Sequence, residues 1–339
     1  MALGAAVSVA VMGRRTPIYK AALCGAVLGT LPDLDVLIDH GEPIANMVLH
    51  RAESHSLVWL SVASLPLAAG IARLTGPWAL WRRWWLAVWL VLITHPLLDV
   101  MTVYGTQLAL PFTNHPYGVG SVFIIDPLYT LPLLVGVLWA ALGKTGAPEG
   151  GVTAATRGFR ANQVGLILST AYLAWGVAAQ AHTTRVAHNS LTAQGINATQ
   201  VLVTAAPLNT LLWRVVAISG PHYFEGFYSL LDTAPQMTFD RFERGTALVP
   251  ELQGILGVQR IQRFSHGFYK LHEKNGRVFI TDLRMGQEPA YAFSFAVAQR
   301  GSPLTPLATP EQMGQRIDLD RGLPWLWQRM WGNPVPPPR

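Results

Sequence analysis

The residues best suited to chemistry interrupt a long apolar run. Between Trp84 and Leu98 every side chain is apolar except Thr94 and His95, and Asp99 follows directly. Residues four apart lie on the same face of a helix, so His95 and Asp99 are predicted to bind one ion or one water together. Ionisable groups are costly to bury in such a segment, and they therefore indicate a functional site.

A second cluster is Leu31-Pro32-Asp33-Leu34-Asp35, at the end of another apolar run. Residue 31 precedes a proline, which disfavours helix and predicts an extended backbone here. On an extended backbone Asp33 and Asp35 would share one face and could bind the same ion. The alternative is a helix terminus with two solvated acids.

A third cluster, His50-Arg51-Ala52-Glu53-Ser54-His55, precedes the next apolar run. Ser54 is predicted as the N-cap of a helix, which would leave His55 a simple first-turn residue. As a ligand, His55 would instead join the carboxylates, with His50 beside it. Arg51 offers a fixed cation for an anionic substrate, and Glu53 is either a proton carrier or a solvated loop residue.

Together the three clusters contain the donor types of a divalent metal site. Imidazole with carboxylate suits zinc first, and also manganese or iron. A metal lowers the pKa of its bound water, and a pair of metals can hold the attacking and leaving oxygens of a phosphoester. The six predicted ligands are Asp33, Asp35, His50, His55, His95 and Asp99, and the predicted catalytic residues are Arg51 and Glu53.

Composition predicts a membrane protein in two parts. Of 339 residues, 50% are hydrophobic and 13% are charged. Residues 1–182 contain 10 Lys and Arg and 8 Asp and Glu, whereas the shorter remainder contains 15 and 11. The net charge of +6 is spread over short loops, so no nucleic-acid partner is expected. Cys24 is the single cysteine, which excludes an internal disulfide.

Six weakly charged segments predict about five to six membrane segments. They lie at about 2–13, 21–38, 56–72, 84–101, 121–142 and 161–181. Lys and Arg gather in the loops at about 14–20, 73–83 and 143–160, which are therefore predicted to be cytoplasmic. All the predicted ligands then lie at the outer ends of the segments, and the C-terminal part lies outside the cytoplasm.

The remainder of the chain is predicted to form a small β-rich (α+β) extracytoplasmic domain, residues 183–332. Short β-branched or aromatic runs occur at 200–204, 213–218, 223–228, 277–283 and 291–297. Asn275-Gly276 predicts a hairpin turn. Trp325, Trp327 and Trp331 suit either a membrane-interface anchor or a packed cap. The proline-rich tail 333–339 is predicted to be disordered.

The order of motifs adds a family resemblance. Gly29-Thr30-Leu31-Pro32-Asp33-Leu34-Asp35, His50-Arg51, Ser54-His55-Ser56, Thr94-His95-Pro96-Leu97-Leu98-Asp99 and Tyr104-Gly105-Thr106 occur in this order. Over about residues 3–142 the chain resembles the YdjM-like family of bacterial inner-membrane proteins, described as membrane-bound metal-dependent hydrolases. That family is thought to be distantly similar to zinc-dependent phospholipases C and P1-type nucleases.

The resemblance implies site positions at Asp33, Asp35, His55, His95 and Asp99, with His50 and Arg51 beside them. One departure affects the activity that it implies. Family members begin with a short Asp-containing Thr-His or Thr-Gln motif just before the stretch that is Leu3-Gly4-Ala5-Ala6 here. We expect either an upstream start that restores this motif or the loss of one ligand.

Two functions are compatible with these residues. The first is a multi-pass hydrolase of the bacterial inner (cytoplasmic) membrane, which cleaves a phosphoester or another lipid-borne ester with metal-activated water at the outer face. Its partners would be membrane lipid and a small-molecule or lipid-borne ester substrate. The alternative is a non-enzymatic protein that binds a structural metal or moves ions or protons. A carrier needs polar residues toward the cytoplasmic ends of the segments, which are nearly absent, so the sequence favours the enzyme. It gives no indication of oligomeric state.

Overall fold

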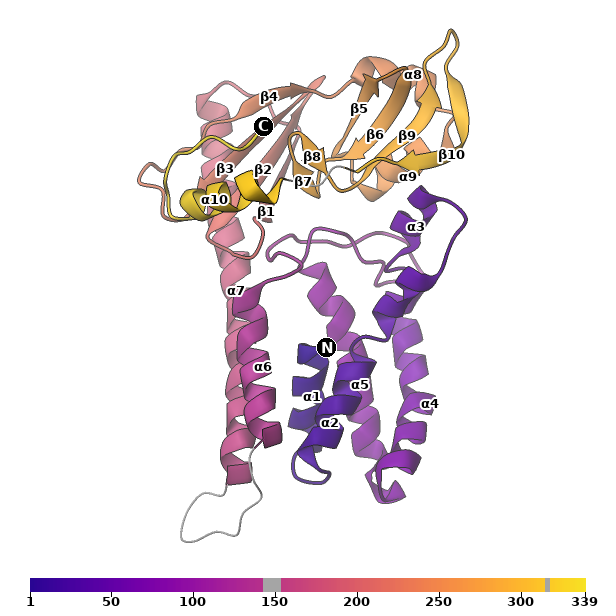
Figure 1. The fold of residues 1–339 in the computed structure, drawn as a ribbon, viewed down its shortest axis with the longest axis vertical. Coiled ribbons are helices and arrows are strands. Elements are labelled where there is room, and N and C mark those ends of the chain that lie inside the picture. Colours follow the sequence, from indigo (N-terminus) through magenta and orange to yellow (C-terminus); the bar gives the residue numbers. More distant parts are fainter. Residues whose placement is uncertain (143–153, 315–317) are drawn as a thin grey trace.

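The structure, a computed structural model, describes residues 1–142, 154–314 and 318–339. An N-terminal helical bundle stands below a C-terminal part built mainly of β-strands, and the long helix α7 runs through both (Figure 1). The main helices of the bundle are α1 Ala2–Met12, α2 Ile18–Leu28, α4 Leu57–Thr75, α5 Trp81–Val100, α6 Pro127–Leu142 and α7 Ala154–Ala193.

Each of the six predicted membrane segments overlaps one of these helices. Three described helices are long and apolar enough to cross a bilayer: Leu57–Thr75, Trp78–Val100 and Gly158–Ala193. The other three, α1, α2 and α6, are apolar but shorter, at 10–17 residues. The structure therefore supports a helical membrane region with three candidate spans.

Close contact between α1 and α2 depends on two glycines. A Cβ at Gly4 would lie 2.3 Å from the Gly25 carbonyl oxygen, and one at Gly25 would lie 2.2 Å from that of Gly4. Any side chain at either position would push the two backbones apart, as at other small-residue helix contacts in membranes. This contact sets the position of the end of α2, from which Gly29 and the first aspartate cluster follow.

The first aspartate cluster is helical, which corrects the extended backbone predicted there. Pro32–Leu37 form the 3-10 helix η1, and Leu31 before it is also helical, with φ −57° and ψ −42°. A 3-10 helix turns about 120° per residue, so Asp33 and Asp35 point in different directions. The shared face predicted for the two carboxylates does not exist.

The segment between α2 and α4 contains two more short elements, α3 Pro43–Leu49 and η2 Glu53–His55. Helix α4 has Ser56 as its N-cap, whose Oγ accepts a hydrogen bond from the Trp59 N–H at 3.3 Å. The prediction of Ser54 as the N-cap was therefore wrong, because the cap lies two residues later. The 3-10 helix η3 Trp78–Leu80 leads into α5.

The C-terminal part contains two four-stranded antiparallel sheets. One has the order β1-β2-β3-β4 and the other β10-β9-β6-β5. The strands are β1 Gln200–Ala205, β2 Leu212–Ser219, β3 His222–Ser229, β4 Asp240–Glu243, β5 Tyr269–Lys274, β6 Arg277–Asp282, β9 Ser294–Gln299 and β10 Thr305–Gln312, with the short pair β7 Gly286–Gln287 and β8 Ala290–Tyr291. The predicted β-rich character is confirmed.

The predicted Asn-Gly hairpin is also present. Asn275 and Gly276 have φ of 52° and 71°, and the flanking Lys274 and Arg277 pair across β5 and β6. Two positive φ values are what a two-residue hairpin turn requires. Helical pieces complete this part: η4 Thr246–Leu248, α8 Val249–Leu252, α9 Leu256–Phe264 and α10 Leu319–Met330.

Helix α7 joins the two parts without a break. Its outer portion packs Val186 and Ala187 against Val203 and Trp213 of the first sheet. The domain boundary predicted after residue 182 falls inside this helix, which ends at Ala193. The extent of the two domains otherwise stays a prediction.

Contacts at the C-terminus argue against the disorder predicted for 333–339. Arg339 pairs with Glu225 at 2.5 Å and with Asp240 at 2.6 Å, so the tail lies along the first sheet. The two tryptophans of α10 differ in solvent exposure: Trp325 is buried, whereas Trp327 is exposed. Both roles proposed for the tryptophans therefore have a side chain suited to them.

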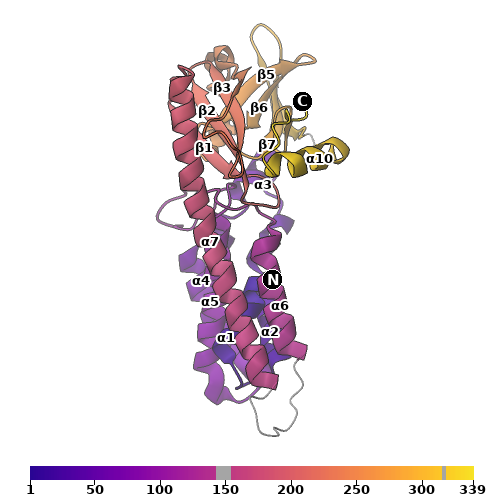
Figure 2. The same cartoon turned by 90° about the vertical axis from the view of Figure 1, so that its left-hand side faces the viewer.

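The two ends of the bundle differ as the charge pattern predicts. The α1–α2 and α4–α5 connections lie at the end away from the β-rich part, and residues 31–55 and the loop after α5 lie at the near end (Figures 1 and 2). Arg14, Arg15 and Arg73 belong to the far end. Residues 143–153 of the third predicted cytoplasmic loop lie outside the described residues. Which end faces the cytoplasm stays a prediction.

Candidate metal centre

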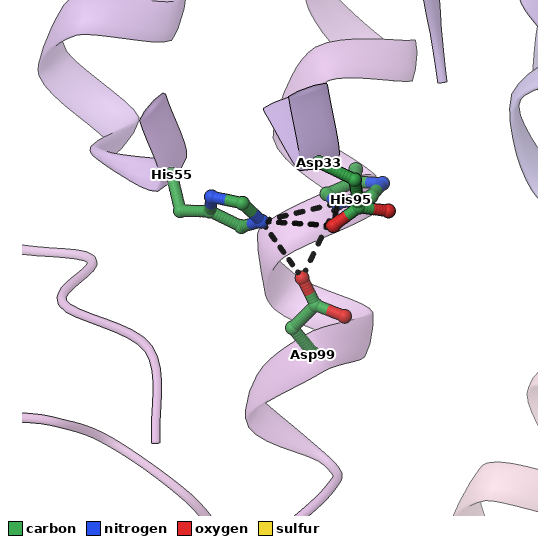
Figure 3. A group of neighbouring side chains, drawn as sticks. All are labelled: Asp33, His55, His95 and Asp99. Carbon is green, nitrogen blue, oxygen red and sulfur yellow. Dashed lines mark hydrogen bonds and ion pairs between the residues drawn. The ribbon is translucent and has the colours of Figure 1, made fainter. Parts of the chain in front are cut away.

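Four side chains from three elements converge at the end of α5 that lies nearer the β-rich part. His95 and Asp99 come from α5, His55 from η2 and Asp33 from η1, and each offers one ligand atom to a common centre (Figure 3). The predicted shared face of His95 and Asp99 is confirmed, with His95 Nε2 3.3 Å from Asp99 Oδ2. The bend from α2 into η1 and the turn before α4 bring in the other two.

Five of the six distances among the four ligand atoms fit a tetrahedral ion, and the sixth, between Asp33 and Asp99, is within 4.8 Å. His55 Nε2 lies 3.2 Å from His95 Nε2 and from Asp99 Oδ2. Asp33 Oδ1 lies 3.4 Å from His55 Nε2 and 3.3 Å from His95 Nε2. A regular tetrahedron with an edge of about 3.3 Å has its centre about 2.0 Å from each corner, which is the Zn–N distance in proteins.

The second nitrogen of each imidazole fixes which nitrogen faces the centre. His95 Nδ1 lies 3.0 Å from the Gly29 carbonyl oxygen, and so must donate to it. His55 Nδ1 lies 2.8 Å from Ser54 Oγ, and that hydroxyl donates to Asp35 Oδ2 at 2.5 Å. When the two rings are neutral, the Nε2 lone pairs therefore point at the centre, as in metal-bound histidines.

Asp35 and His50, two of the predicted ligands, lie outside the group of four. Asp35 accepts hydrogen bonds from the Arg51 N–H at 2.9 Å and from Ser54, and contacts His50 Nδ1 at 2.8 Å. Burial alone would raise the pKa of Asp35, but its contacts with His50, Ser54 and the Arg51 N–H lower it to about 2. The anionic Asp35 thus holds together the turn that presents His55.

Arg51 is buried behind the cluster. Its Nη2 lies 3.3 Å from Asp99 Oδ1, the carboxylate oxygen turned away from the two imidazoles. Its guanidinium also lies 5.1 Å from the centre of the Tyr104 ring. Arg51 therefore holds Asp99 in place, whereas the sequence suggested direct contact with substrate.

The cluster is closed on one side and open on the other. The His55 side chain is 0% exposed and the Asp33 side chain is 43% exposed. Leu34, Leu37 and Ile38, which follow Asp33, are exposed apolar residues at the end of the bundle nearer the β-rich part. Access to the four ligand atoms is therefore past Asp33. Glu53 is exposed at the start of η2, and the described contacts do not connect it to the cluster.

The residues fit a divalent cation. Asp99 Oδ2 is buried and accepts no hydrogen bond from the described residues, although both imidazoles lie within 3.3 Å. Burial alone would raise the pKa of Asp33, but the neighbouring His55 and His95 hold it well below its usual range. Two carboxylates and two imidazole lone pairs around one point need a positive charge, and these donors suit zinc, manganese or iron.

The sequence did not reveal three supporting groups. Ser54 orients His55, the Gly29 carbonyl orients His95, and Tyr104 packs on Arg51. Gly29, Ser54 and Tyr104 all lie within the motifs quoted for the family resemblance, which was the available signal. The Gly29 carbonyl carries no side-chain signal at all.

Comparisons with known proteins agree with the membrane region. The curated protein described as "Uncharacterized protein YfhP" from Bacillus subtilis (strain 168) is 26% identical over 138 residues, which is 40% of this chain and 42% of that protein. The match thus spans less than half of the relative. No solved structure matches the chain. The sequence model of the YdjM inner membrane protein family matches residues 1–183, which are more than half of the sequence. The chain belongs to the YdjM family of inner membrane proteins.

Proposed function

We propose that this protein is a membrane-bound, metal-dependent hydrolase that cleaves a phosphoester or another lipid-borne ester at the outer face of the inner membrane. The observation that carries the proposal is the set of two imidazoles and two carboxylates with one open side. Four protein ligands usually fill a structural zinc site, whereas in catalytic sites three protein ligands leave the fourth position to water or substrate. Asp33 is the most exposed of the four ligands here, so we infer that water would enter beside it as a further ligand.

Asp33, His55, His95 and Asp99 would hold the ion, which supplies Lewis acidity and lowers the pKa of a bound water. Asp35 and Ser54 orient His55, and Arg51 fixes Asp99 through its outer oxygen. The protein thus contributes a rigid ligand set, as second-layer hydrogen bonds do in metalloenzymes. The distant similarity of the resembled family to phospholipases C and P1 nucleases supports the same class of reaction.

The surroundings of Asp33 support a lipid-borne substrate. Leu34, Val36, Leu37 and Ile38 are exposed beside the open side of the cluster. In a bilayer these side chains would lie next to lipid, so an ester at the headgroup level could reach the cluster without leaving the membrane. Water-soluble phosphoesters should be poorer substrates.

The ion or proton carrier is less well supported. Within the described parts of α1, α2, α4, α5, α6 and α7 up to residue 181, His95 and Asp99 are the only Asp, Glu or His residues. Intramembrane proton and ion paths usually consist of chains of such groups. A path from the cluster to the basic end of the bundle is therefore missing from this set of residues.

The test is hydrolysis by the purified full chain in detergent with zinc, manganese or iron. Substrates are a phospholipid, a lipid-linked diphosphate, a fatty-acyl ester and a soluble aryl phosphodiester. We expect chelator-sensitive turnover that is fastest on one lipid and is lost, together with bound metal, in His95→Ala.

The matched control is His222→Ala, which removes an imidazole from β3 that pairs with Glu243 far from the cluster. It should retain both metal and activity. Bound metal in the wild type without metal-dependent turnover on any of these esters would contradict the hydrolase and favour the non-enzymatic alternative.

A further inference from the structure

A pocket of about 750 Å³ lies between the outer loops of the membrane region and the β-rich part. Its lining includes Tyr104 and Ile124 from the first part, and Arg214, Arg284 and Trp325 from the second. This volume is within the range of small-molecule sites in proteins. Asp33, His55, His95 and Asp99 do not line it, so it is separate from the metal cluster.

The inner wall of the pocket carries two buried arginines. Arg214 donates through Nε and Nη2 to Glu225, and also to the Leu283 carbonyl and Tyr291. These contacts occupy four of its five N–H groups. Arg284 uses three, two on Asp282 and one on the Val103 carbonyl, so two remain. The described residues thus leave three donors on side chains that line the pocket.

The rest of the lining is mostly apolar and reaches an apolar surface. Ile124 and Leu319 line the pocket and are 49% and 63% exposed. Exposed side chains continue from them at Ile125, just before α6, at Leu128 in its first turn, and along α10 at Leu323 and Trp327. Helix α10 projects from the lower edge of the β-rich part above the outer end of α6 (Figures 1 and 2).

We propose that this pocket binds a membrane amphiphile with an apolar chain and a phosphate or carboxylate head. Arginine has donors and no acceptor, so the spare N–H groups of Arg214 and Arg284 select a head that carries acceptor oxygens. The apolar rim accommodates the chain, and α10 places Trp327 where tryptophan is favoured, at a membrane surface. The bilayer itself is the source of the ligand.

The experiment uses three photoreactive probes with the same 16-carbon chain: a fatty acid, a lysophosphatidate and a fatty alcohol. Purified full-length protein is labelled in a non-ionic detergent with chelator present, and labelled peptides are identified by mass spectrometry. Because no metal or turnover is needed, this result is independent of the proposed hydrolysis. We expect saturable labelling by the acid or the phosphate within residues 120–124 or 319–327, at least tenfold above the alcohol.

Ala292→Trp tests the pocket directly, because Ala292 lines it and is exposed enough to accept a larger side chain. It should reduce labelling by the preferred probe at least tenfold. Ala308→Trp, a similar exposed substitution on β10 outside the lining, should leave labelling unchanged. Arg284→Lys keeps a cation beside Asp282 but removes the planar donors, so it should reduce labelling by the acid or phosphate and spare the alcohol.

Equal labelling of the wild type and Ala292→Trp would overturn the proposal, as would labelling confined to the membrane helices or equal labelling by all three probes. If Ala292→Trp elutes as an aggregate, the head-group comparison in Arg284→Lys decides. A loss of preference for the charged heads supports the pocket, and an unchanged preference overturns it. The fatty acid and the lysophosphatidate distinguish the two head groups.

Discussion

Replacing Ser54 by alanine should weaken metal binding without removing a ligand. Ser54 Oγ lies 2.8 Å from His55 Nδ1 and donates to Asp35 at 2.5 Å. In Ser54→Ala the Nδ1–H of a fully buried ring loses its acceptor, because Asp35 Oδ2 is 3.7 Å away. His55 would then be free to rotate or to change the nitrogen that carries its proton.

The size of the effect follows from the two hydrogen bonds that the Ser54 hydroxyl makes. Loss of a second-layer partner typically costs 10–100-fold in metal affinity, which corresponds to about 1.4–2.7 kcal/mol. A hydrogen bond that involves a charged group contributes about 1.5–3 kcal/mol, so the two estimates agree. Competition with a chromophoric chelator should show a Kd for zinc raised 10–100-fold and an unchanged stoichiometry.

Ser56→Ala is the matched control, two residues along the same turn. Ser56 Oγ caps α4 and donates to the Leu110 carbonyl, and neither bond reaches His55. Loss of the cap should destabilise the protein by about 1 kcal/mol while metal affinity stays at the wild-type value. Wild-type affinity in Ser54→Ala, or equal weakening in both variants, would refute the orienting role of Ser54.

Three further predictions concern topology, packing and pH. In a cysteine-free background, cysteines placed at exposed Ala79 and Ser302 should react with an impermeant reagent from opposite sides of the membrane, and labelling from one side would exclude the proposed orientation. Gly25→Ala should separate α1 from α2 and lower the thermal unfolding temperature by several degrees, whereas an unchanged temperature would show that the contact can relax. Burial and then the nearby Lys270 lower the pKa of His272 to about 4. As the pH falls, the unfolded chain therefore takes up this proton first, near pH 6.5, and the stability of the folded protein decreases from there down to about pH 4. In His272→Phe the unfolding temperature should depend less on pH between these two values. An unchanged pH dependence would contradict the assignment.

Local signals account for what the sequence predicted correctly. The i, i+4 pair of His95 and Asp99 depends only on helix geometry within α5. The Asn275-Gly276 turn depends only on the backbone freedom of two residues. Apolar length located the six segments, although three of the helices are shorter than a full span.

The errors arose where two local rules compete and tertiary contacts decide. A proline disfavours helix in the residue before it, yet it also suits the first position of a helix. At Pro32 the second tendency prevails, so Asp33 and Asp35 diverge. Ser54 and Ser56 are both reasonable N-caps. Ser54 instead donates a hydrogen bond to Asp35, which lies nineteen residues earlier in the chain. The partner of Arg51 is likewise distant in sequence, at Asp99.

Because α7 is unbroken, the number of residues in it determines the height and the rotation of the β-rich part relative to the membrane region. The candidate membrane helix within α7, Gly158–Ala193, has 36 residues and is about 54 Å long, against a bilayer core of about 30 Å. One residue inserted near the membrane surface would rotate everything beyond it by about 100° and lift it by about 1.5 Å. Seven residues would restore the facing to within about 20° but raise the sheets by about 10 Å, away from Tyr104 and the outer loops. The length and the rotation of α7 thus determine whether the β-rich part can contact the loops of the membrane region.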